Sequence, residues 1–157
     1  MISLSLSLPE PDSFWRTTWD KAREGDPASI RESDLLYDYF GTEVEMIIGD
    51  VEFIPKRSFV PLADLALSFR WVIERISKGA DASISFTENA EIISLEQAGE
   101  NITVSTTVHP KCASIPRREL LEALTEFLKS AHALLVTEVP GLDRNPTVRT
   151  IATAIER

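Results

Sequence analysis

The clearest alternation of apolar and polar positions lies between Pro61 and Lys78, where apolar residues recur at spacings of three and four. Such spacing places them on one face of a helix. The apolar positions are Leu62, Leu65, Ala66, Phe69, Val72, Ile73 and Ile76. Pro61 suits the first helical turn, Gly79 stands where a helix would end, and Trp71 lies beside the stripe. The pattern predicts a helix over residues 61–78 with one face covered by a sheet.

A second helical pattern covers residues from about 117 to 138. Its apolar positions are Leu120, Leu121, Leu124, Phe127, Leu128, Ala131, Leu134 and Leu135. Ser114 is a candidate N-cap for this helix, and Pro116 lies near its first turn. Further along, Asn145 followed by Pro146 predicts the start of a short C-terminal helix, because Asn is a good N-cap and Pro a good first residue.

Alternation with a period of two predicts β-strands elsewhere in the chain. The strand segments are 2–8, 42–48, 51–54, 82–86, 90–97 and 102–108. Gly49-Asp50 has the chemistry of a hairpin turn, and Glu88-Asn89 and residues 98–101 form two further turns. Connections this tight favour antiparallel pairing, with the last three strands as a meander.

Two segments before residue 41 are less regular. Residues 14–24 fit a short helix capped by Asp12 or Ser13, with Trp15 and Trp19 four apart on one face. These two side chains can cover the core or form an exposed patch for a partner. Residues 35–40 are aromatic and apolar, and their period fits a strand as well as a helical turn.

The order of these elements predicts an α+β fold. In the simplest arrangement, the helices at about 61–78 and 117–138 pack on one face of an antiparallel sheet, and the short C-terminal helix follows them. Strands followed by a helix occur twice, which is a weak repeat of elements. A chain of 157 residues fits a single domain covering 1–157.

The charge of the chain is uneven. The net charge is −9, and residues 1–53 hold twelve acidic residues against four basic ones. Such a segment repels nucleic acid and attracts a basic partner, although an acidic surface can also serve solubility alone. The basic cluster of Lys111, Arg117 and Arg118 is too small for a nucleic-acid site. The single cysteine and the absence of a signal-peptide or membrane-spanning pattern predict a cytoplasmic protein that does not contact a membrane.

Motifs for catalysis are weak. His109 and Cys112 lie three residues apart, but a structural zinc site needs four ligands and a nucleophilic cysteine needs a base and an oxyanion donor. The chain has no glycine-rich phosphate loop. Asp34 and Asp38 could form a carboxylate pair, but acidic residues are common here and pair by chance. We therefore expect no enzyme activity, no catalytic residue, no cofactor and no metal.

The acidic, aromatic segment from residue 32 to 52 is the candidate partner-binding site, since tyrosines ringed by charge are typical of interface centres. The predicted binding residues are Glu32, Asp34, Tyr37, Asp38, Tyr39, Glu43 and Glu45. In the alternative interpretation the apolar residues of this segment are core, and the acids are solvated.

The chain resembles bacterial immunity proteins of contact-dependent inhibition and other polymorphic toxin systems. The resemblance, at about residues 42–157, is in the helix PLADLALSFRWVIERISKG, the meander ASISF, AEIISLEQ and NITVSTTV, and the helix RRELLEALTEFLKSAHALL. It implies tight binding to one cognate toxin, and many such toxins are basic nucleases. A regulatory or adaptor module with a non-toxin partner and a small-ligand-binding protein remain the alternatives, and the oligomeric state is not predicted.

Overall fold

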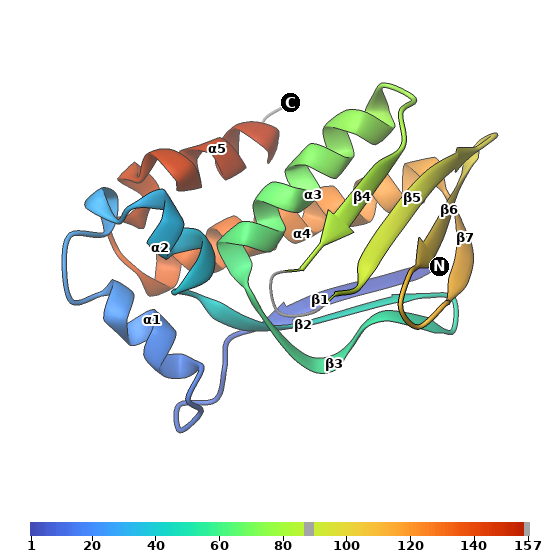
Figure 1. Cartoon of the computed structure of the whole chain (residues 1–157). Helices are drawn as coiled ribbons and strands as arrows, with labels where there is room; N and C mark the ends of the chain where they lie inside the picture. The colour runs from blue at the N-terminus through green and yellow to red at the C-terminus, as the bar shows by residue number, and fades with distance from the viewer. Residues whose placement is uncertain (87–89, 156–157) are drawn as a thin grey trace.

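The computed structural model describes residues 1–86 and 90–155 (Figure 1). Its strands are β1 (Ile2–Ser7), β2 (Gly41–Ile48), β3 (Val51–Pro61), β4 (Ala82–Ser85), β5 (Ile92–Ala98), β6 (Asn101–Thr106) and β7 (Cys112–Pro116). Its helices are α1 (Arg16–Ala22), α2 (Glu32–Tyr37), α3 (Leu62–Ser77), α4 (Arg117–Glu138) and α5 (Pro146–Ile155), with 3-10 turns at Pro27–Ser29 and Leu142–Arg144. The predicted turn at Glu88-Asn89 lies outside the described residues.

The strands form two antiparallel sheets, so the predicted α+β class is confirmed. The first sheet has the order β1-β2-β3 and the second the order β4-β5-β6-β7. The sequence predicted one sheet. The strands form two sheets because β3 runs directly into α3, and the next strand, β4, pairs with β5 and not with β3. Both sheets consist of sequential neighbours, as the tight predicted turns require.

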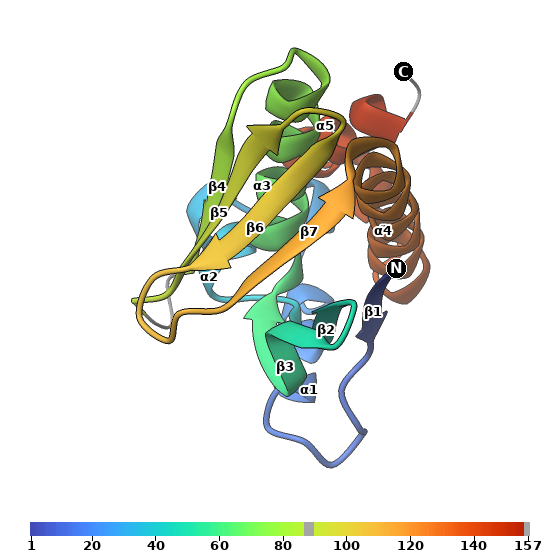
Figure 2. The same ribbon diagram turned by 90° about the vertical axis from the view of Figure 1, so that its right-hand side faces the viewer.

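The two long helices pack against each other beside both sheets (Figure 2). The rings of Phe69 on α3 and Phe127 on α4 meet edge to face, with centroids 5.0 Å apart. Helix α4 packs along β1, and α3 packs along β4. The strands-then-helix order therefore occurs twice, and each helix contacts the first strand of the other half.

The predicted apolar stripes account for most of the core. On α3 the residues Leu62, Leu65, Ala66, Phe69, Val72 and Ile76 are buried, and Ile73 is half-buried. Trp71 lies outside the stripe as expected: its side chain is 45% exposed, with the guanidinium of Arg75 placed 5.3 Å from the ring centroid. Helix α4 begins and ends where the sequence predicts, and the predicted cap of α5 is present, since the Thr147 N–H donates to Asn145 Oδ1 at 3.0 Å.

The predicted N-cap at Ser114 is wrong. Ser114 lies inside β7, opposite Thr103 of β6, and the adjacent Ile115 is fully buried. Pairing with β6 satisfies the backbone of this segment, so it extends the second sheet up to the first residue of α4.

Strand β3 is longer than predicted, and the segment whose type the sequence left undecided is partly helical. Strand β3 extends seven residues beyond the predicted end at Ile54, with an irregular register opposite Val44 and Met46. Residues 32–37, which overlap the undecided segment, form the short helix α2. Within residues 1–86 and 90–155, no helix combines the length and apolar character needed to cross a membrane.

Candidate functional site

The outer face of the first sheet carries glutamates that point away from the core. Along β2 the residues Val44, Met46 and Ile48 are fully or almost fully buried, so Glu43 and Glu45 point to the opposite face. Residues directly opposite on neighbouring strands share a face. Glu43 is opposite Ser7 and Phe59, Glu45 is opposite Ser5, and Ile47 is opposite the exposed Glu52. We call Glu43, Glu45 and Glu52 the acidic face.

Three aromatic rings lie beside the acidic face. Trp15 stacks on Phe59 of β3, with centroids 5.4 Å apart and planes at 9°. Phe14 meets Trp15 edge to face at 5.7 Å. Phe14 is 73% exposed and Trp15 is 37% exposed, so much of this surface contacts solvent. We call Phe14, Trp15 and Phe59 the aromatic cluster.

Buried Trp19 holds the aromatic cluster in place. Its indole Nε1–H donates to the carbonyl of Gly41 at 2.8 Å, and its ring meets Phe40 edge to face at 5.1 Å. These contacts fix α1 against the start of β2. Trp15 comes four residues earlier, and its ring passes directly over Gly41.

Gly41 leaves the space that the Trp15 ring occupies. A Cβ at residue 41 would lie 2.7 Å from Trp15 Cε3 and 3.3 Å from Thr18 Oγ1. We expect Gly41→Ala to displace the ring and to lower the free energy of unfolding by about 1–3 kcal/mol, the usual cost of overpacking. Urea unfolding and near-ultraviolet circular dichroism measure the two effects. Gly25→Ala is the matched control, because a Cβ there meets nothing within 4 Å. Equal stability of the two variants would contradict the proposed contact.

The other predicted binding residues belong to α2 and the residues after it. Glu32, Tyr37 and Asp38 are exposed, and Asp34 forms an ion pair with Arg31 at 3.3 Å. Tyr39 is half-buried, with its ring 6.0 Å from that of Phe40.

The predicted residues therefore do not form one surface. Helix α2 packs on α3, and in Figures 1 and 2 it lies on the helix side of the first sheet, whereas α1 lies at the end of that sheet, beside the start of β2. Glu43 and Glu45 share the outer face with residues outside the predicted set, namely Phe14, Trp15, Phe59 and Glu52. Of these, the sequence raised Trp15 as a candidate, and Glu52 ends the candidate segment 32–52 without being among the predicted binding residues. Phe59 was missed because the predicted strand ended at Ile54, so its direction could not be inferred.

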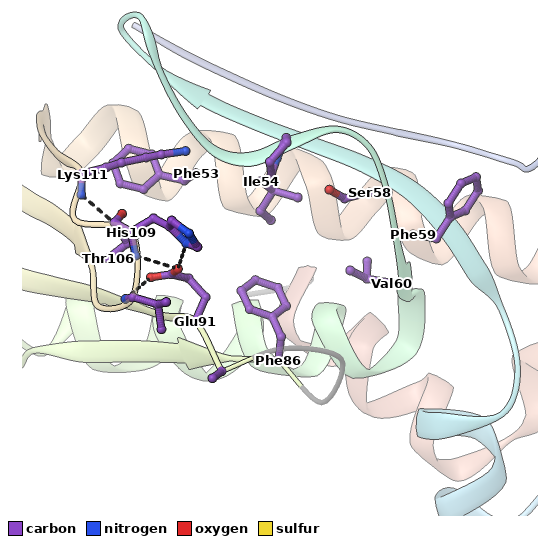
Figure 3. Close-up of a pocket in the computed structure, with 13 residues that line it drawn as sticks. Phe53, Ile54, Ser58, Phe59, Val60, Phe86, Glu91, Thr106, His109 and Lys111 are labelled. Carbon is purple, nitrogen blue, oxygen red and sulfur yellow. Dashed lines mark hydrogen bonds and ion pairs between the residues drawn. The ribbon is translucent and has the colours of Figure 1, made fainter.

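A cavity of about 480 Å³ opens between β3 and the loops of the second sheet (Figure 3). Phe53, Ile54 and Val60 of β3 line one side, and Phe86 faces them from the end of β4. Polar residues of the segment after β6 lie at one end, among them His109.

The Glu91 carboxylate organises this polar end. It accepts hydrogen bonds from the backbone N–H of Val108 at 2.8 Å and of His109 at 3.2 Å, and His109 Nδ1 lies 3.5 Å from Oε2. Desolvation favours a higher pKa for Glu91, but the hydrogen bonds from Val108 and His109 outweigh it and lower the pKa below its usual value. Glu91 therefore holds the loop as a carboxylate.

Within the described part of the chain, no group of three His, Cys, Asp or Glu side chains could hold a metal ion. Cys112 is exposed at the start of β7.

No protein-family model matches the chain, and neither does any curated protein or solved structure. A functional proposal therefore depends on what the described side chains can bind.

Proposed function

We propose that this chain neutralises a cognate protein toxin by binding it stoichiometrically through the acidic face and the aromatic cluster. The observation that carries the proposal is the aromatic cluster of Phe14, Trp15 and the half-buried Phe59, which is partly exposed next to outward-pointing glutamates. Large aromatic anchors contribute most of the energy at protein interfaces, and a charged rim provides orientation and specificity.

The charge of this surface favours a basic partner, such as a nuclease toxin. Across the first sheet, Glu43 and Glu45 have serines of β1 as their neighbours, and Glu43 has Phe59 on its other side. On the β3 side of Glu45 the register is irregular, and the segment opposite contains the exposed Arg57. The negative charge of the face is therefore strongest on the β1 side, where it would accelerate the approach of a basic protein.

Two double charge-reversal variants test which acidic residues speed association with the partner. The first test is whether the gene beside that of this chain encodes a toxin domain; that purified domain is then the partner, with association followed by stopped-flow fluorescence. We expect Glu43→Lys with Glu45→Lys to lower the association rate constant by about tenfold or more at low salt, and the effect to shrink at high salt. Glu32→Lys with Asp38→Lys is the control, because it makes the same change in charge at the two ends of α2, which lies on the helix side of the sheet.

Phe14→Ala tests the aromatic cluster in the same assay. Its side chain is 73% exposed, so the fold should be unaffected. Loss of an interface anchor should weaken the complex by about tenfold or more, mainly through faster dissociation. A stronger effect of the α2 variant than of the β2 variant would contradict the proposed surface. A stable complex with a protein that is not a toxin would favour the adaptor function over neutralisation.

A further inference from the structure

We propose that the cavity between β3 and the second sheet binds a small amphiphile with an apolar body and an anionic head. The cavity shares Phe59 with the aromatic cluster, and Lys111 at its polar end donates to the backbone of Glu52, but the argument for the cavity does not depend on the proposed toxin binding. The inference rests on the shape of the cavity, on its apolar walls and on the hydrogen-bonding groups that remain at one end.

The size and walls of the cavity suit a small apolar body. Its volume of about 480 Å³ lies in the range of small-molecule sites, which is roughly 300–1,000 Å³. Phe53, Ile54 and Val60 are at most 6% exposed, so they form a fixed floor on β3. Phe86 points toward Ile54 across the cavity (Figure 3). Val108, at 54% exposed, lies at the mouth.

The acceptors at the polar end are already occupied. The Glu91 carboxylate accepts from the backbone of Val108 and His109, as described above. The Thr106 hydroxyl donates to the His109 carbonyl at 2.6 Å and accepts from the Lys111 N–H at 2.9 Å. These groups hold the loop and offer little to a ligand that donates hydrogen bonds.

Donors remain at the same end. Among the residues that the structure describes, the Lys111 ammonium donates one hydrogen bond, to the Glu52 carbonyl at 2.8 Å, and an ammonium has three donors. The His109 side chain is 82% exposed, and Nδ1 is its nitrogen on the Glu91 side. Figure 3 places both side chains at one end of the cavity. An anionic head beside Lys111 would gain charge-assisted hydrogen bonds, whereas a cationic head would be repelled by Lys111. The head must lie away from the Glu91 carboxylate, which is beside His109 and already accepts the backbone N–H groups of Val108 and His109.

Three ligands with the same alkyl chain test the head group: decanoate, decanol and decylamine. Each is titrated calorimetrically into the full chain. We expect saturable 1:1 binding of decanoate and an affinity for decylamine at least about tenfold lower. Lys111→Gln should weaken decanoate binding by about three- to tenfold and leave decanol binding unchanged. Lys129→Gln is the matched control, since Lys129 is on α4 beside Glu126 and does not line the cavity.

A carboxylate at the mouth tests the location. Val108→Glu should abolish decanoate binding through like-charge repulsion, and because Val108 is exposed the fold should be preserved. Ile92→Glu adds the same charge at an exposed residue outside the cavity lining, so its effect should be small. Circular dichroism checks the fold of each variant. The proposal is overturned if decanoate shows no saturable binding up to about 1 mM, if decylamine binds as tightly, or if Val108→Glu has no effect. Binding of the toxin domain would persist in each of those cases.

Discussion

Trp19→Ala should lower the free energy of unfolding by about 3–5 kcal/mol, the range measured for truncation of large buried aromatic side chains. The side chain is fully buried, so the variant leaves a cavity of indole size between α1 and the start of β2. It also removes the edge-to-face contact with Phe40 and the donor to the Gly41 carbonyl. Urea unfolding followed by far-ultraviolet circular dichroism measures the loss without depending on tryptophan fluorescence.

Two variants separate the contributions of Trp19. Trp19→Phe keeps an aromatic ring but leaves the Gly41 carbonyl without its partner, which should cost about 1–3 kcal/mol. Trp71→Ala is the surface control: this side chain is 45% exposed, and its loss should cost under about 1 kcal/mol. A Trp19→Ala variant as stable as Trp71→Ala would contradict the anchoring role. Since Trp15 lies over Gly41, we also expect Trp19→Ala to disorder the aromatic cluster and weaken partner binding.

The two long helices could be predicted because each presents an apolar stripe of period 3.6 with a clear end signal. Strand β7 could not, because Ile115 is the only fully buried residue among its five. One buried side chain gives no alternation to detect, and a serine two residues before a proline at the start of a helix matches a cap signal equally well. The number of sheets could not be predicted either, because alternation shows which face of a strand is buried but not which strand is its neighbour.

The acidic residues of the candidate site could be found from the sequence, but the side of the sheet on which each one lies could not. Asp38 and Glu43 are five residues apart, yet Asp38 is the C-cap of α2, which packs on α3, whereas Glu43 lies on the outer face of β2. Between them Phe40 is fully buried and has φ of 63°, a left-handed conformation that is rare for aromatic residues. This turn redirects the chain from α2 into β2. Composition does not encode such a turn, and for that reason the segment looked like one continuous acidic surface.

Asn145 was correctly predicted as an N-cap, but its contacts with distant residues could not be predicted from the sequence. As the N-cap of α5, its Oδ1 accepts the Thr147 N–H. The side chain is only 1% exposed, and its Nδ2 donates to the carbonyls of Pro27 at 3.0 Å and Ile30 at 3.1 Å. A cap can be recognised from local sequence, but contacts to residues more than a hundred positions away cannot. These contacts tie α5 to the segment between α1 and α2.

We therefore expect Asn145→Ala to lower the free energy of unfolding by about 2–3 kcal/mol, because a lost cap costs about 1 kcal/mol and the carbonyls of Pro27 and Ile30 each lose a hydrogen bond from Nδ2. Asn145→Ser is the matched variant. Serine is a good N-cap but cannot donate to both carbonyls, so it should recover about 1 kcal/mol and no more. Urea unfolding of the three proteins gives the comparison. If Asn145→Ser were as stable as the unmodified chain, the contacts of Nδ2 with Pro27 and Ile30 would contribute nothing, and Asn145 would act as a local cap alone.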